Sequence, residues 1–185
     1  MRSLLISAFL LLTCAGEAQA ASARQSPSIE AFVDRITWGR TTESVASATS
    51  LGIDRWLDAQ LQSNSSPQLP PSVQAQIDAL RISRMPIAQL AAEMDAQNKA
   101  AALIQDPPKR QSAQKAYQMA MRALREEITT RSLLRDLYSP AQLQEQMTWF
   151  WSNHFNILAE KRDIRTMLGD YEDNAIRPHA LGKFR

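Results

Sequence analysis

Apolar residues recur at intervals of three and four along most of the chain after residue 25. This spacing is typical of amphipathic helices. Capping residues and prolines predict that helices begin at Ser26–Pro27, Thr42, Asp54, Ser72 and Pro86. Gly52 is placed to end the second of these helices. The pattern therefore predicts a series of short helices in the first half of the chain.

Two long helical segments follow. The first begins at Pro86 and is expected to stop at the Asp106-Pro107-Pro108 sequence, because proline disrupts a helix interior. The second covers residues 111–138 and is the longest predicted helix. Both are rich in Ala, Gln and Met, which favour helix formation. We expect them to form a helical hairpin with the two prolines near its turn.

The clearest helix start is the sequence Ser139-Pro140-Ala141-Gln142. Ser139 is expected to be the N-cap, with Pro140 at the first position and Gln142 closing a capping box. The following helix carries an apolar and aromatic stripe: Leu143, Met147, Phe150, Trp151, Phe155 and Leu158. Tryptophans at helical spacing beside Phe and Met are interpreted as core residues, and stacking on sugar rings is the alternative.

These patterns predict an all-α fold, an irregular multi-helix bundle with a long helical hairpin. The chain has only 5 glycines in 185 residues and few consecutive β-branched residues, which argues against a sheet. Residues 21–185 are expected to form one helical domain. Nothing after Arg185 closes the last helical pattern. We therefore expect this domain to be the N-terminal part of a larger helical protein.

The first twenty residues have the order of a secretory signal peptide. Arg2 gives a basic start, residues 4–12 are apolar, and residues 18–20 read Ala-Gln-Ala. The apolar run is shorter than the roughly 20 residues that span a bilayer, so a retained anchor is the weaker interpretation. We expect cleavage after Ala20 and export of a bacterial protein to the periplasm or the medium.

Cys14 is the only cysteine and leaves one alternative open. A lipoprotein would be anchored through this residue. Cleavage after Ala20 would instead leave a chain without cysteine. Such a chain holds no disulfide, no thiolate nucleophile and no Cys-ligated metal.

Composition narrows the classes of function. The net charge is only +2, with acids and bases mixed along the chain, so no nucleic-acid partner is expected. No second apolar run reaches membrane length, which predicts no transmembrane segment in the mature chain. Serine-hydrolase, phosphate-loop, dinucleotide and zinc-protease motifs are absent from the sequence. No motif therefore indicates a cofactor.

The two histidines are the main candidates for chemistry. His154 lies on the aromatic stripe and is interpreted either as a core histidine or as a metal ligand or general base. His179 is the only other histidine. The pair needs one carboxylate to complete a facial triad for a divalent metal, and no ligand spacing requires it. The candidate carboxylates are Glu160, Asp163, Asp170, Glu172 and Asp173.

Two further polar residues complete the candidate site. Arg177, which precedes Pro178 and His179, has the chemistry to bind a carboxylate or phosphate. The favoured interpretation is a salt bridge from Arg177 to the acidic residues just before it. Asn153 and Asn156 flank His154 and are interpreted as structural hydrogen-bonding residues.

Several stretches resemble one bacterial family, the domain of unknown function 1800. They are residues 35–41 (RITWGRT), 51–61 (LGIDRWLDAQL), 147–156 (MTWFWSNHFN) and 171–185, which contain IRPHALGKFR. The resemblance implies a large, secreted, mainly helical protein without an established activity. It also implies that any site would include the positions that match the family's polar motifs, which are Asn153, His154, Arg177 and His179.

The sequence leaves two classes of function open. The first is an exported helical scaffold or interaction module of the bacterial cell envelope. Its partners would be envelope proteins or a missing C-terminal half. The alternative is a metal- or cofactor-dependent envelope enzyme with His154 and His179 near its site.

Overall fold

The computed structural model describes residues 28–62, 68–155 and 166–183, and within these residues the regular structure is entirely helical. The predicted all-α class is therefore confirmed. Several predicted features lie outside the described residues. These are the signal peptide, Cys14, the Ser26–Pro27 start, Asn156, Leu158, Glu160 and Asp163.

The N-terminal helices form a small core of their own. Helices α1 (Ile29–Ile36), α2 (Thr42–Leu51) and α3 (Ile53–Leu61) bury Val33, Ala48 and Trp56 together. Gly52 separates α2 from α3 with a φ of 79°, a conformation that glycine adopts without strain, so its predicted role is confirmed. The caps expected at Thr42 and Asp54 were misplaced. The N-caps are Ser28, Thr41 and Gly52.

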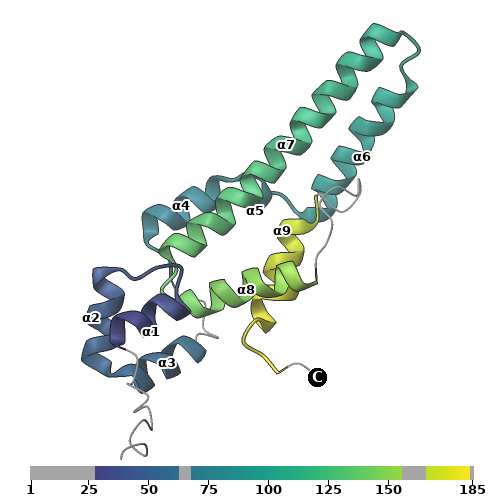
Figure 1. Cartoon of the computed structure of the whole chain (residues 1–185). Helices are drawn as coiled ribbons and strands as arrows, with labels where there is room; N and C mark the ends of the chain where they lie inside the picture. The colour runs from purple at the N-terminus through teal and green to yellow at the C-terminus, as the bar shows by residue number, and fades with distance from the viewer. Residues whose placement is uncertain (1–27, 63–67, 156–165, 184–185) are drawn as a thin grey trace, which may run out of the picture.

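The middle of the chain forms the hairpin and a second core. Short helices α4 (Pro71–Ala79) and α5 (Arg81–Arg84) lead into α6 (Ile87–Leu103) and α7 (Pro107–Tyr138). Helix α4 begins at Pro71, so Ser72 lies within its first turn and is not the cap as predicted. Helices α6 and α7 run side by side as the predicted hairpin (Figure 1). The shared core residues are Leu90, Met94, Tyr117, Met121 and Leu124.

The double proline has a second role that the pattern did not predict. The side chain of Asp106 accepts a hydrogen bond from the Lys109 amide and caps α7, and both prolines lie in the first turn. Proline lacks an N–H group, but the first-turn amides have no intrahelical acceptor in any case. Helix α7 therefore begins at Pro107 and not at residue 111.

The start of α8 (Gln142–His154) contradicts the predicted capping box. Ser139 is the C-cap of α7, and its hydroxyl accepts from the Ala141 amide. The N-terminus of α8 is instead capped by Gln60 of α3. Its Oε1 accepts from the Leu143 amide at 3.2 Å, and its Nε2 donates to the Pro140 carbonyl at 3.0 Å. A residue 83 positions earlier in the chain thus defines where α8 begins.

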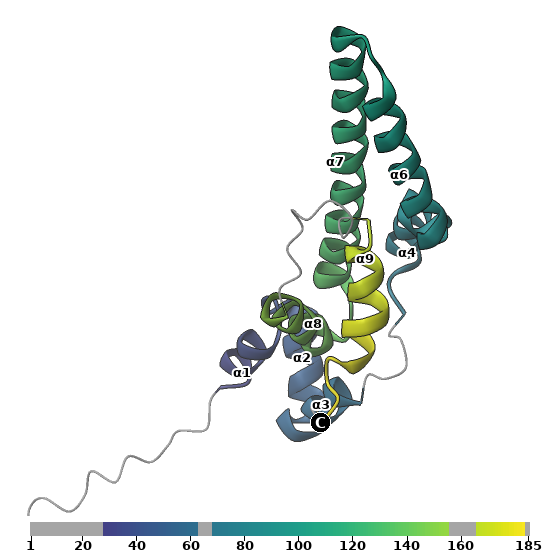
Figure 2. The ribbon, with the colours of Figure 1, turned by 90° about the vertical axis from the view of Figure 1, so that its right-hand side faces the viewer.

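The C-terminal described segment packs against both α7 and α8. It consists of α9 (Leu168–Tyr171), a π-helical stretch η1 (Glu172–Ile176) and a 3₁₀ turn η2 (Arg177–His179). Figures 1 and 2 show this yellow segment beside α8 and near the lower end of α7. This packing brings η2, which carries Arg177 and His179, next to α8, which carries Asn153 and His154.

None of the helices in the described ranges is both long enough and apolar enough to cross a lipid bilayer.

We predict that Gln60→Ala lowers the free energy of unfolding by about 1–3 kcal/mol, because it leaves a helix-terminal amide and a carbonyl without their partner. Urea denaturation measures this loss. The control is Gln74→Ala, which removes an exposed hydrogen bond and should change stability by less than about 0.5 kcal/mol. Equal effects of the two substitutions would contradict the capping role of Gln60.

Candidate functional site

Helix α8 turns its polar edge inward and its aromatic edge outward. The side chains of Glu145 and Thr148 are buried, with only 4% and 2% of each residue exposed. Trp149 and Phe150 are 57% and 46% exposed. The prediction that the aromatic stripe faces the core was therefore wrong, and Leu143, Met147 and Trp151 are only partly buried.

The buried edge is held by a group of ionic side chains that we name the charge cluster. Arg177 of η2 is its centre. It pairs with Glu145 of α8, with Glu172 at 2.8 Å and with Asp173 at 3.4 Å. The predicted salt bridge to the preceding acidic residues is confirmed. The charge cluster comprises Arg131, Arg135, Glu145, Glu172, Asp173 and Arg177.

Helix α7 supplies the other two cations. Nη2 of Arg131 lies 3.0 Å from the Asp173 carboxylate, and Arg135 contacts the same carboxylate. Gly169 lies beside them, and a Cβ atom there would lie 2.5 Å from Nη2 of Arg131, so a larger residue would require this guanidinium to shift. The charge cluster thus joins α7, α8 and the C-terminal segment in one place.

The protonation of the charge cluster follows from this pairing. Burial acts to lower the pKa of Arg177, but the Glu145, Glu172 and Asp173 carboxylates outweigh it and the pKa is raised. Burial lowers the pKa of Arg131, and Asp173 only partly offsets the effect. Three arginines and three carboxylates balance, which makes burial of the group tolerable.

Asp136 of α7 lies near the charge cluster without an arginine of its own among the described ion pairs. Burial, followed by repulsion from Glu145 and Glu172, raises its pKa to about 6. A substantial fraction of Asp136 is therefore protonated in mildly acidic solution, which avoids a surplus of negative charge.

The exposed side of α8 carries two groups of ring contacts, Trp38 with Trp149 and Phe150 with Trp151, His154 and Phe155, which we together name the aromatic face. Trp38 meets Trp149 edge to face, with ring centroids 5.5 Å apart. Its backbone amide also donates to the Gln142 side chain at 3.2 Å. The segment after α1 is thus fixed against α8 and extends the aromatic face.

His154 belongs to the aromatic face and is exposed, so its interpretation as a core histidine was wrong. Its imidazole stacks on Phe150 with centroids 6.0 Å apart and an interplanar angle of 11°. Neighbouring Asn153 is also exposed and donates from Nδ2 to the Trp149 carbonyl at 2.8 Å. Asn153 therefore makes a structural hydrogen bond within its own helix.

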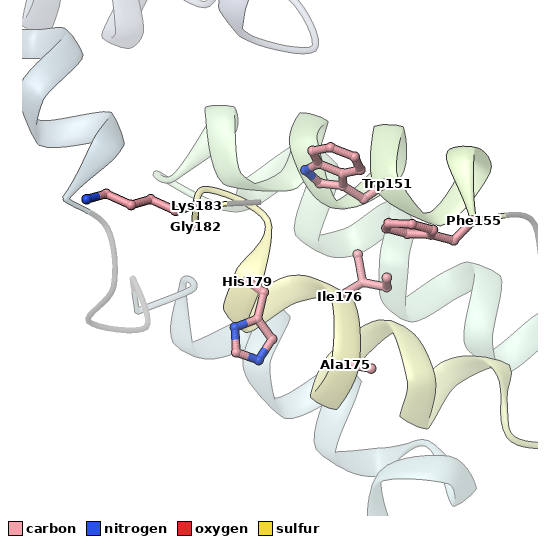
Figure 3. A pocket seen from close by; sticks show the side chains of 7 residues that line it. All are labelled: Trp151, Phe155, Ala175, Ile176, His179, Gly182 and Lys183. Carbon is pink, nitrogen blue, oxygen red and sulfur yellow. The ribbon is translucent and has the colours of Figure 1, made fainter. Parts of the chain in front are cut away.

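His179 lines a different feature, a pocket of about 140 Å³ that we name the small pocket. Trp151 and Phe155 reach it from α8, and Ile176 lies on its other side (Figure 3). Figure 3 also shows the imidazole of His179 pointing away from Trp151. The indole N–H of Trp151 donates to the Ala180 carbonyl at 3.0 Å and fixes that wall.

The two histidines do not line one pocket, because His154 is not among the residues around the small pocket. Asp170 and Asp173 line a separate cavity of about 330 Å³ between α4, α7 and the C-terminal segment. In the described part of the chain, no three His, Cys, Asp or Glu residues are grouped closely enough to hold a metal ion. The described residues therefore do not assemble the predicted facial triad.

Fold and site together define an all-helical protein with a neutral, partly buried charge cluster beneath an exposed aromatic face. The family model described as "Protein of unknown function (DUF1800)" matches residues 31–185, so the chain belongs to this family. The resemblance stated from the sequence is confirmed. Comparisons with curated proteins and with solved structures found no significant match.

Sequence reasoning missed Glu145, Arg131 and Arg135. No local signal marks them, because Glu145 is 32 residues from Arg177 and pairs with it only in the folded chain. The one available signal was the position of Arg131 and Arg135, which interrupt the apolar stripe of α7, whereas Glu145 lies on the polar edge of α8. A charged residue there is equally consistent with a solvated face.

We predict that Arg177→Met lowers the free energy of unfolding by about 3–5 kcal/mol, because Glu145 then stays buried without its cation. Chemical denaturation gives the value. Arg40→Met is the matched control, since its pair with Asp34 is exposed and should contribute no more than about 1 kcal/mol. Adding Glu145→Met to Arg177→Met should restore much of the loss. A loss of unfolding free energy in Arg177→Met no larger than in Arg40→Met would contradict the role of Arg177 as the cation of the buried Glu145.

Proposed function

We propose that this chain is an exported helical protein of the bacterial cell envelope that acts as an interaction module, with the aromatic face as its binding surface for a partner protein. The observation that carries the proposal is the orientation of α8, which exposes Trp149 and Phe150 while Glu145 is buried. Export is supported by the basic start, the apolar run and the Ala-Gln-Ala sequence of the first twenty residues.

The aromatic face has the chemistry of a protein interface. Aromatic residues are enriched in interface centres, and burying them removes apolar area from water at about 25 cal/mol per Å². The rings of Trp38 and Trp149 are already held edge to face, and His154 is stacked on Phe150. Little side-chain freedom is lost when such rings bind a partner, which favours affinity.

The small pocket gives the partner a place to anchor. Interface residues with the largest energetic effect commonly fill a pocket on the other protein. A volume of about 140 Å³ suits one apolar or aromatic side chain, and Trp151 and Phe155 provide its apolar wall. Lys183 lines the same pocket, which favours an acidic residue beside that anchor.

Site-specific photocrosslinking in the bacterial cells that express the protein tests this proposal. A photoreactive amino acid at position 150 should give one discrete adduct, and this adduct should disappear when Trp149→Glu is added. Position 51 is the matched control, because Leu51 and Phe150 are both 46% exposed. Intact mass of the recovered chain tests export at the same time, with cleavage expected after Ala20.

Two results would overturn the proposal. The first is the same pattern of adducts from positions 51 and 150. The second is an adduct at position 150 that persists in the Trp149→Glu variant, because binding would then not depend on the aromatic face. An unprocessed N-terminus would overturn the export part alone.

A further inference from the structure

The positive charge of this protein is concentrated at one end of the helical hairpin. Residues 96–125, which surround the turn between α6 and α7, contain six cationic residues and one acidic residue. The whole chain has a net charge of +2, so the remainder carries a net charge of −3. We name this half of the hairpin the basic tip. Its cations are Lys99, Lys109, Arg110, Lys115, Arg122 and Arg125.

The cations of the basic tip are exposed and weakly paired. Lys99 and Lys109 contact Asp95 and Asp106 in exposed pairs of their own helical turns, which contribute little. Within the described part of the chain, the other four cations have no carboxylate within ion-pair distance. The charge of the basic tip is therefore available to an outside partner.

The basic tip also exposes large apolar side chains. Leu103 and Met119 are 76% and 69% exposed, the highest values among the large hydrophobic residues that the structure describes. Leu103 ends α6 at the turn. Met119 follows Lys115 by four residues and precedes Arg122 by three, which places all three on one face of α7. This face lies away from the one that packs Met121 and Leu124 against α6.

We propose that the basic tip docks on the surface of an anionic lipid membrane. Each cation near such a surface favours binding by about fivefold, and exposed apolar side chains enter the boundary between headgroups and acyl chains. The cations lie on both helices and around the turn. They do not converge on one point where a single anionic group could bind all of them. Such a distribution suits many mobile lipid headgroups better than the fixed charges of a single folded partner.

This site is separate from the aromatic face. Figures 1 and 2 show the turn of the hairpin at the far end of α6 and α7, well away from α8. A chain docked through the basic tip would hold the aromatic face away from the bilayer. The membrane contact therefore does not depend on the proposed protein partner, and either proposal can fail alone.

Cosedimentation with vesicles tests the proposal on the chain as recovered from cells. We expect binding to mixed phosphatidylglycerol–phosphatidylcholine vesicles, weaker binding to phosphatidylcholine alone, and loss of the difference at high salt. Lys109→Gln with Arg110→Gln should weaken binding to the anionic vesicles about 25-fold. Leu103→Gln should weaken binding to a smaller extent.

The matched control is Arg55→Gln with Arg84→Gln, which removes the same charge from exposed positions outside the basic tip. It should change binding much less than the tip variant does. All variants share one N-terminus, so any lipid affinity of the apolar residues 4–12 cancels in the comparison. Circular dichroism should show equal helix content in all variants, because the substituted side chains are exposed.

Equal weakening by the tip and control variants would overturn the proposal, since the effect would then come from net charge alone. Equal binding to both kinds of vesicle would also overturn it. A third outcome is binding to soluble polyglutamate, but not to vesicles, that depends on Lys109 and Arg110. That result would mean that the basic tip binds an acidic protein, and it would overturn the proposal of a membrane contact.

Discussion

The pairing of Glu145 with Arg177 is the interaction on which the rest of the site depends. A buried carboxylate without a cation is strongly destabilising, so α8 can adopt its orientation only where η2 supplies the arginine. Arg131 and Arg135 neutralise Asp173 and thereby connect the same group to α7. Because the polar edge of α8 is fixed inward, geometry places its aromatic edge outward. The aromatic face is thus a consequence of the charge cluster beneath it.

The sequence predicted the features that depend on local chemistry. Helical periodicity, the hairpin and the break at Gly52 were confirmed, since each arises from residues close together in the chain. The start of α8 was mispredicted because Gln60, from a distant helix, caps it in place of Ser139. The orientation of α8 was mispredicted for the same reason. Its apolar stripe looked like a core face, and the partners of Glu145 follow only from the fold.

The candidate site was therefore predictable only in part. Arg177 lies in a salt-bridge network as expected, while His154 and His179 lie on different features. Neither histidine is held in a shared cluster of ligands in the described residues. Instead, the described residues present two exposed surfaces of contrasting chemistry, the aromatic face on α8 and the basic tip at the turn of the hairpin. The two proposals, a partner protein and an anionic membrane, rest on these two separate surfaces.

The central claim is that α8 buries Glu145 and exposes the aromatic face. Hydroxyl-radical footprinting of the purified chain tests it most directly, with oxidation followed residue by residue. Trp149, which is 57% exposed, should react rapidly, and Trp56, which is 4% exposed, should be protected. Protection of Trp149 equal to that of Trp56 in the unmodified chain would contradict the account.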